Sequence, residues 1–531
     1  MECRRDWPLE SKAKMKLEMP FLISLLCFVL IPSFVISHEV ITRNQFPHGF
    51  LFGTATSSYQ IEGAVDEDGK GLNNWDVYSH IPGKIRGGVD ADVADDHYHR
   101  FEEDIDLMHS LGIDAYRFSI SWTRILPKGR FGGVNQAGVV FYNNLIESLL
   151  SKGIEPFVTL NHFDTPQELE ERYGSWLSPL IQDDFAYLAD VCFQSFGNRV
   201  KYWTTINEPN HFAEFGYMKG RYPPGRCSKP FGNCSQGNSE VELVVVMHNM
   251  IMSHAKAADI YRKSYQAKQG GSIGIVVSAY MYVPISDDEV DCQAAKRALA
   301  FNVAWFLDPL IHGDYPPEMR QVLGPQLPRF SSEESNQLKH GIDFIGINHY
   351  STFYAKDCIY SQCDKGKHAI EGLVSIGFEK DGVPIGDPQL GMLVFHVVPS
   401  GLEKIIGYLK TRYNNKPMFV TENGFSQKDD GSQLVNELLQ DDRRVEYHKS
   451  YLGSLKNAIR DGADVRGYFV WSLMDNFEWD LGYTIRFGLH YVDYQTLKRI
   501  PKLSAKWYRN FLTNNDTQIG QVPGIQLKRE I

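Results

Sequence analysis

The chain has 531 residues, of which 43% are hydrophobic and 13% aromatic, a composition typical of folded globular proteins and not of disordered ones. Its formal net charge is -11 at pH 7, and charges of both signs are scattered along its length. A net negative surface repels nucleic-acid phosphates and anionic lipid head groups. The composition therefore disfavours nucleic-acid binding and peripheral membrane binding.

The first 37 residues predict a cleaved signal peptide. Basic residues precede an apolar run over 21–36, and Val35-Ile36-Ser37 offers small residues for cleavage after Ser37. A membrane anchor is the alternative, but the run is short for a span, contains Pro32 and lacks a following basic cluster. We expect removal of 1–37, a mature folded domain over 38–531, and no stable membrane association. The destination is then the cell exterior, the cell wall or the vacuole.

Two pairs of cysteines lie close together in segments rich in Gly, Pro and Ser. In an oxidising compartment each pair is able to close a short loop. We predict a disulfide between Cys227 and Cys234, and the sequence leaves the pairing of Cys358 with Cys363 open. Two N-glycosylation sequons, at Asn233 and Asn515, fit the same secretory route.

Eight short and nearly continuous apolar runs recur along the chain, several of them after a helical stretch that ends in glycine. Glycine just beyond a helix supplies the left-handed conformation without steric strain. Continuous apolar runs are typical of parallel strands that are buried on both faces. In chain order the predicted strands lie within 49–55, 115–122, 156–162, 199–209, 272–279, 342–350, 417–424 and 463–473.

Amphipathic helical patterns separate these runs, and no interior linker interrupts them. Eight alternating strands and helices predict a single α/β domain, a (β/α)8 TIM barrel. A doubly wound sheet is the alternative, but no glycine-rich dinucleotide loop follows the first strand. Insertions near 220–240, 280–290 and 355–395 are rich in Gly, Pro, Ser and Cys, and we expect them to be loops that wall the catalytic end of the barrel.

The ends of the predicted strands carry residues that a purely structural strand does not need. Glu208 closes the fourth strand and Glu422 the seventh, so the two face each other across the barrel mouth. Glycoside hydrolysis uses such a pair of carboxyl groups. Taken singly, Asn-Glu-Pro is usually a solvated turn and Thr-Glu-Asn-Gly a loop start; together they favour a glycosidase. Arg117, at the end of the second strand, is expected to lie beside Glu422 and keep it ionised.

From about Phe46 to Phe511 the chain resembles the plant β-glucosidases of glycoside hydrolase family 1. Seven motifs occur in order, namely FPHGFLFGTATSSYQIEG, YRFSISWTRILP, LNHFDTPQEL, TINEPN, GINHY, FVTENG and WSLMDNFEW followed by FGLHYVD. The resemblance implies a retaining enzyme that acts on a small β-glucoside without a cofactor or metal. It makes Glu208 the general acid/base and Glu422 the nucleophile.

The resemblance also assigns the residues around the substrate. Asn207 would bind the sugar 2-hydroxyl, and Tyr350 and Arg117 would orient and stabilise the nucleophile. Without the resemblance, Trp471 and Phe487 would be assigned to ordinary core packing. The implied sugar subsite consists of Gln60, His162, Asn207, Asn348, Tyr350, Trp471, Glu478, Trp479 and Phe487.

Two details narrow the expected substrate. Glu208 stands where thioglucosidases of the family carry Gln, and the Glu478-Trp479 pair favours an unphosphorylated sugar. The segment GMLVFHVVPSGLEK lacks a tryptophan that often lines the aglycone site, and one of residues 394–396 is expected near that position. This segment is similar to the coniferin-type group, which acts on monolignol glucosides.

The acidic and His-rich run over 90–99 suggests either a metal site or a charged helix start, and we expect the helix start, because acids interact favourably with a helix N-terminus. Two other functions remain open. A transglucosidase would use the same residues with an acceptor hydroxyl in place of water. A non-catalytic sugar-binding relative would tolerate loss of one Glu, whereas this chain retains both.

Overall fold

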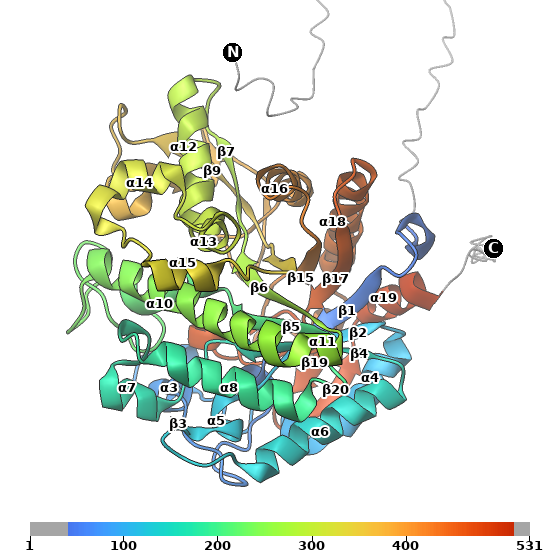
Figure 1. Ribbon diagram of the computed structural model, residues 1–531. Helices are drawn as coiled ribbons and strands as arrows, with labels where there is room; N and C mark the ends of the chain where they lie inside the picture. Colours follow the sequence, from blue (N-terminus) through green and yellow to red (C-terminus); the bar gives the residue numbers. More distant parts are fainter. Residues whose placement is uncertain (1–40, 514–531) are drawn as a thin grey trace, which may run out of the picture.

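The computed structural model describes residues 41–513; the predicted signal peptide over 1–37 and the sequon at Asn515 lie outside this range. Eight parallel strands form a closed barrel, shown at the centre of Figure 1. Each coincides with one predicted run, so the (β/α)8 barrel is confirmed. In barrel order they are β1 (Leu51–Ala55), β2 (Ala115–Ser119), β4 (Glu155–Asn161), β5 (Tyr202–Asn207), β6 (Ser272–Ser278), β8 (Phe344–Asn348), β15 (Met418–Asn423) and β17 (Val465–Trp471).

Long helices surround the barrel and pack against its outer face (Figure 1). The expected glycine after a helix occurs at Gly112, which follows α4 in the left-handed conformation with φ 78°. The principal helices are α4 (His97–Leu111), α6 (Gln136–Ser151), α8 (Ile181–Phe196), α10 (Ser239–Ile260), α13 (Trp305–His312), α16 (Pro399–Arg412), α18 (Asp442–Arg460) and α19 (Leu503–Thr513).

Shorter elements complete the fold. The remaining helices are α2 (Ser58–Ile61), α3 (Asn74–Ser79), α5 (Trp122–Ile125), α7 (Gln167–Tyr173), α9 (Pro209–Ala213), α11 (Gln266–Gln269), α12 (Glu289–Leu299), α14 (Pro317–Leu323), α15 (Ser332–Leu338) and α17 (Val435–Leu439). Short strands outside the barrel are β3 (Pro127–Arg130), β11 (Glu379–Lys380), β12 (Val383–Pro384), β13 (Asp387–Pro388), β14 (His396–Val397), β16 (Gln427–Lys428), β18 (Ile485–Arg486), β19 (His490–Asp493) and β20 (Lys498–Pro501).

Four phenylalanine rings fill the inside of the barrel. Phe157 contacts the rings of Phe344, Phe419 and Phe469 with centroid distances of 5.6, 5.3 and 5.1 Å. Gly53 on β1 leaves room for them, because an added Cβ would lie 2.6 Å from the ring of Phe469. This apolar layer closes the barrel from within and forms a rigid base for the polar strand ends.

The predicted insertions are more ordered than expected. Strands β7 (Met281–Pro284), β9 (Thr352–Asp357) and β10 (Val374–Gly377) form a three-stranded sheet, so two insertions pair with each other. Strand β9 is only partly buried and has no regular alternation, which explains why composition alone suggested loops. The loop over 220–238 contains the predicted Cys227–Cys234 disulfide and the exposed Asn233, and a second disulfide joins Cys358 to Cys363.

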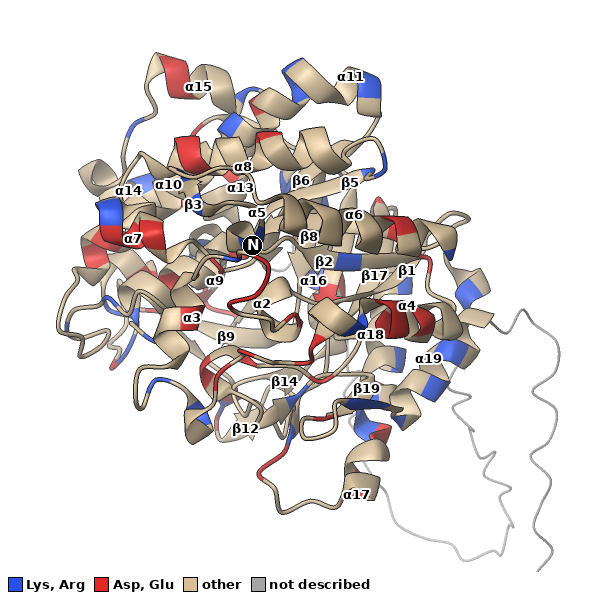
Figure 2. Cartoon of the chain, turned by 90° about the horizontal axis from the view of Figure 1, so that it is seen from below, with Lys and Arg blue, Asp and Glu red and all other residues tan. Residues whose placement is uncertain are grey.

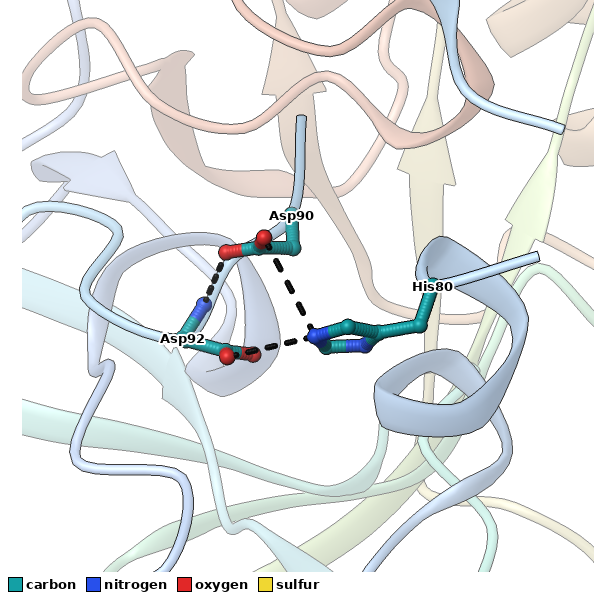
Figure 3. A group of neighbouring side chains, drawn as sticks. All are labelled: His80, Asp90 and Asp92. Atoms are coloured by element: carbon teal, nitrogen blue, oxygen red, sulfur yellow. Dashed lines mark hydrogen bonds and ion pairs between the residues drawn. The ribbon is translucent and has the colours of Figure 1, made fainter. Parts of the chain in front are cut away.

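Only the last residues of the acidic and His-rich run over 90–99 belong to the start of α4. Asp96 precedes the helix, and no acid lies in the first turn. Asp90 and Asp92 instead face His80, whose Nε2 lies 3.9 and 3.3 Å from their carboxylate oxygens (Figure 3). His80 Nδ1 contacts the Asp76 carbonyl at 2.7 Å, and this bond and the two carboxylates raise the pKa of His80. The group is a surface cluster in which two carboxylates face one imidazole ring.

Charged side chains of both signs are spread over helices and loops, as seen from below in Figure 2. This distribution agrees with the mixed charge of the sequence. Among residues 41–513, no helix combines the length and the apolar character that crossing a bilayer requires.

Candidate active site

Both candidate carboxyl groups lie at the carboxyl-terminal end of the barrel, where strand pairing is irregular. The β5–β6 register shifts between Thr204 and Asn207, and the β15–β8 register shifts between Val420 and Glu422. Such irregularities turn a strand end and re-aim its side chains. Glu208 and Glu422 are 7% and 4% exposed, so both carboxyl groups are largely desolvated.

Glu208 has a backbone conformation that few non-glycine residues adopt. Its φ and ψ are 43° and 56°, in the left-handed region, and its N–H donates to the carbonyl of Val276 at 2.9 Å. Pro209 follows as the first residue of α9, a position where the missing N–H is tolerated. The left-handed conformation costs about 1–2 kcal/mol and is stabilised by the surrounding barrel. It fixes the direction in which Glu208 leaves the strand.

Glu422 is surrounded by donors. The guanidinium of fully buried Arg117 lies 2.5 Å from Oε1, and the hydroxyl of Tyr350 donates to Oε2 at 2.8 Å. Both contacts are strongest when the carboxyl group is ionised, because each places a positive charge or a hydrogen against the carboxylate. The expected position of Arg117 beside Glu422 is therefore what the structure shows.

A hydrogen-bond network connects the strand ends. Arg117 Nη2 donates to Asn207 Oδ1 at 2.6 Å, and Asn348 Nδ2 donates to the same oxygen at 3.1 Å. The amide nitrogen of Asn207 lies 3.1 Å from His162 Nε2. Thr421 donates to Asn348 Oδ1 at 2.7 Å. Arg117 thus links the strand that carries Glu422 to the strand that ends before Glu208.

The surroundings of the two carboxyl groups determine which of them holds a proton and which is ionised. Burial, followed by the charge of Glu422, raises the pKa of Glu208 to about 8. Burial also raises the pKa of Glu422, but Arg117 and Tyr350 oppose that rise. Two like charges in a desolvated site do not ionise together, so the negative charge settles on Glu422 and the proton on Glu208. The pair is suited to act as an acid and a nucleophile.

The predicted sugar subsite surrounds the same opening. His162 lies between two indoles, with ring centroids 5.9 Å from both Trp471 and Trp479. Burial, followed by the charge of Arg117, holds the pKa of His162 well below its usual value, so the ring is neutral. Burial and the charge of Glu422 raise the pKa of Glu478 to about 8. Neutral imidazole and carboxyl groups beside indole rings are suited to hold hydroxyl groups.

Gln60 and Phe487 complete the subsite. Gln60 Nε2 donates to the Phe477 carbonyl at 2.8 Å, directly before Glu478. Phe487 meets the ring of Tyr350 edge-on with centroids 5.9 Å apart. The predicted catalytic and sugar-contacting residues are therefore all brought to one end of the barrel. Trp471 and Phe487 belong to the same buried aromatic group as Tyr350, which is why the sequence alone suggested core packing.

Three aromatic residues beside the carboxyl groups were not singled out from the sequence pattern. Phe395 stacks on Tyr350 at 5.6 Å, and Tyr280 lies 6.0 Å from Phe395 and 5.3 Å from Phe353. Burial, followed by the charge of Glu208, raises the pKa of Tyr280. Tyr280 follows the fifth barrel strand, and its position just after a strand end is the sequence feature from which it could have been predicted.

Residues 394–396 differ in direction although they are adjacent. Phe395 points toward Tyr350, whereas Val394 is 53% exposed and His396 stacks on Phe378 at 4.7 Å. Of these three residues, Phe395 is therefore the one that contacts Tyr350, the partner of Glu422. We name Tyr280, Phe353 and Phe395 the aromatic wall.

Comparisons with known proteins agree with this geometry. Residues 42–517 match the family described as glycosyl hydrolase family 1. A rice protein named probable inactive beta-glucosidase 14 is 56% identical over 478 residues, covering 90% of this chain and 92% of its own. Coniferin beta-glucosidase of Pinus contorta is 50% identical over 505 residues, covering 94% and 98%. A rice Os3BGlu6 beta-glucosidase mutant, solved in a covalent complex with Glc, superposes with a TM-score of 0.85 at 46% identity, covering 89% of this chain and all of that one.

Proposed function

Because this chain belongs to glycosyl hydrolase family 1 and is a glycoside hydrolase of the β-glucosidase type, we propose that it is a secreted retaining β-glucosidase of phenolic glucosides. The observation that carries the proposal is the unequal environment of the two carboxyl groups. Glu422 accepts from Arg117 and Tyr350, while burial and the charge of Glu422 keep the proton on Glu208.

In the first step the carboxylate of Glu422 attacks the anomeric carbon as the bond from that carbon to the aglycone oxygen breaks. Glu208 gives its proton to the departing oxygen, so the aglycone leaves as a neutral alcohol or phenol. The product is a glucosyl ester of Glu422. Arg117 and Tyr350 stabilise Glu422 before attack and as it becomes the leaving group in the second step.

The second step uses the change of charge produced by the first. Once Glu422 is an ester it has no negative charge, and one cause of the raised pKa of Glu208 disappears. Glu208 is then a carboxylate that removes a proton from water as the water oxygen attacks the anomeric carbon. The ester bond breaks, Glu422 regains its charge and β-glucose leaves. The covalent Glc complex of the rice relative supports a covalent step.

The aromatic wall supports an aromatic aglycone. Tyr280 lies near Glu208, the group that protonates the leaving oxygen, and Phe353 and Phe395 extend from it. A planar ring stacked there gains apolar burial and favourable ring contacts. The similarity to coniferin beta-glucosidase supports monolignol glucosides within this class. Two disulfides and the exposed sequon at Asn233 support the secretory route.

The test is hydrolysis of 4-nitrophenyl β-glucoside and coniferin by the secreted protein, with Glu422→Ala as the inactive control. Azide should restore turnover of the activated glucoside in this variant and give an α-glucosyl azide, because the small anion enters from the face vacated by the carboxylate. A β-glucosyl azide would disprove the role of Glu422.

One relative is named a probable inactive beta-glucosidase, so the same experiment should also test for a protein that does not hydrolyse glucosides. If wild-type protein forms an alkyl glucoside from an added alcohol acceptor but releases no glucose in water alone, it is a transglucosidase. If it binds glucose without any turnover, it is a sugar-binding protein. Either result overturns the hydrolase proposal while leaving the fold and the subsite unchanged.

A further inference from the structure

Three buried charged residues behind the sugar subsite have no part in the proposed chemistry. Asp475, Arg486 and Lys502 form a group that we name the Asp475 cluster. Their side chains are 0%, 5% and 0% exposed. Lys502 Nζ lies 2.6 Å from Asp475 Oδ1, and Arg486 Nη1 lies 2.9 Å from Asp475 Oδ2. The N–H of Gly488 donates to Asp475 Oδ1 at 2.9 Å.

The cluster joins the two chain segments that carry the sugar-facing residues. Asp475 lies between the end of β17 and Glu478, and its backbone N–H donates to the His490 carbonyl at 2.9 Å. Arg486 is the last residue of β18 and directly precedes Phe487. Lys502 stands between β20 and α19 and ties both segments to the outer helix layer.

The segment after Asp475 also controls Gln60. Gln60 Nε2 donates to Asn476 Oδ1 at 2.9 Å and to the Phe477 carbonyl at 2.8 Å. The N–H of Phe477 donates back to the Gln60 carbonyl at 3.2 Å. A shift of this segment would therefore move Gln60 together with Glu478.

The two segments are packed closely against each other. An added Cβ on Gly488 would lie 2.0 Å from the backbone nitrogen of Asp475 and 2.6 Å from the His490 carbonyl. Buried ion pairs are weak evidence for stability, because apolar side chains of similar size often stabilise a core as well. Directional bonds between fully buried charges do fix relative position, and position is what a sugar subsite requires.

We infer that Lys502 and Asp475 are positioning residues of the sugar subsite. They hold the Glu478-Trp479 segment and Phe487 at a fixed separation and so determine how well the hydroxyl groups of the sugar are recognised. This inference rests on the proposed function and deepens it, because it assigns sugar recognition to charges that do not touch the sugar.

The experiment compares Lys502→Met and Asp475→Asn with Arg412→Met. Arg412, whose side chain is 20% exposed, pairs with the buried Asp308 in the outer helix layer, so its loss also leaves a buried carboxylate without its partner but leaves the subsite segments alone. For each variant the melting temperature, the Kd for glucose, and kcat/KM for 4-nitrophenyl β-glucoside and its 4-deoxy analogue are measured. Kinetics are recorded well below the lowest melting temperature. Asp475→Asn keeps the size of the side chain and provides the test if Lys502→Met does not fold.

We expect all three variants to melt earlier, but only the two cluster variants to lose function. Their kcat/KM for the glucoside should fall by about 10- to 100-fold. The loss should be smaller for the 4-deoxy substrate, which lacks a hydroxyl that the segment positions. Glucose binding should weaken in parallel. Arg412→Met should keep kcat/KM and the glucose Kd within about twofold of wild type. Its site is remote from the subsite and shares no partner with it, so the two should act independently.

Two results would overturn the inference. One is a folded cluster variant with wild-type kcat/KM and glucose Kd; the other is an equal loss in Arg412→Met. Failure of the proposed function looks different, since wild-type protein would then bind glucose but release no aglycone. In that case the glucose Kd of the variants still decides whether the cluster positions the subsite.

Discussion

Glu208 and Glu422 have the same side chain and opposite roles because of what touches them. Of the two carboxyl groups, Arg117 and Tyr350 contact Glu422, and the charge that results on Glu422 keeps Glu208 protonated. The residues around the pair can therefore be tested through pH profiles, which separate an acid from a nucleophile.

The alkaline limb of the pH profile should belong to Glu208. The pKa of Glu208 is raised to about 8, so the group holds its proton below that pH and loses it as the pH rises. We expect kcat/KM for an alkyl β-glucoside to fall above about pH 8. In Glu208→Gln this limb should vanish for 2,4-dinitrophenyl β-glucoside, whose leaving group needs no proton. Equal losses on both substrates would argue against the acid role.

Tyr350→Phe should affect the acidic limb. Removing the hydroxyl takes a hydrogen bond from the ionised form of Glu422, so its pKa rises and the acidic limb moves to higher pH. We expect kcat to fall by about 10- to 100-fold, the usual effect of losing a hydrogen bond to a charged group. Tyr413→Phe, which loses a bond to Asp308 in the outer layer, is the matched control. An unmoved acidic limb would contradict the assignment.

The catalytic residues and the aromatic wall lie on different structural elements. The barrel strands end in the catalytic residues, whereas the aromatic wall comes from the segments after β6 and β8 and from the turn that contains Phe395. Tyr280 directly precedes β7, and Phe353 lies on β9, the central strand of the three-stranded sheet that these insertions form. Aglycone recognition should therefore respond to changes that leave the barrel chemistry intact.

Phe395→Ala should raise KM for coniferin by about 10-fold, the value of one lost aromatic contact with its buried area. Turnover of methyl β-glucoside, which has no ring to stack, should change by less than about twofold. Phe378→Ala, from the same insertion but packed on His396, is the control. Equal effects on both glucosides would show that Phe395 supports Tyr350 and not the aglycone.

The elements also show where sequence reasoning reached its limit. All eight barrel strands could be predicted, because burial on both faces gives continuous apolar runs. The three-stranded sheet was missed, because strand β9 buries only part of its surface and sits in a polar, glycine-containing stretch. Phe395 could not be separated from Val394 and His396, since the direction of a turn residue depends on distant partners such as Tyr350.

The molecule contains both buried histidines and buried carboxyl groups, and the two sets change the free energy of unfolding in opposite directions as the pH changes. Buried histidines have lowered pKa values, so stability decreases as the pH falls below about 6.5, where the unfolded chain takes up protons. Buried carboxyl groups with raised pKa values lose stability as the pH rises through about 4.5 toward 8. The histidines with pKa values of about 3 to 4 are His211, His254, His349 and His448, and the carboxyls with values of about 7 to 8 are Asp164, Glu170, Glu208 and Glu478.

Between about pH 4.5 and 6.5 the two sets nearly cancel, so the melting temperature should form a plateau there and fall on both sides. Each group contributes about 1.4 kcal/mol per pH unit outside it. Differential scanning fluorimetry at constant ionic strength measures this profile. Asp164→Asn, which mimics the protonated carboxyl, removes one of the opposing linkages, so the plateau should slope upward with pH and the alkaline decline should flatten. A melting temperature that climbs steadily from pH 5 to 8 would contradict the balance.

The separation of the aromatic wall from the barrel strands has an evolutionary meaning. A duplicated gene that accumulates substitutions in the segments around Tyr280, Phe353 and Phe395 explores new aglycones without risking the carboxyl pair, since those residues stand on inserted segments. Recombination between relatives at the strand ends would exchange recognition as a unit. A laboratory library confined to these segments should therefore yield many folded, active enzymes with altered aglycone preference, whereas one confined to the strand ends should yield few.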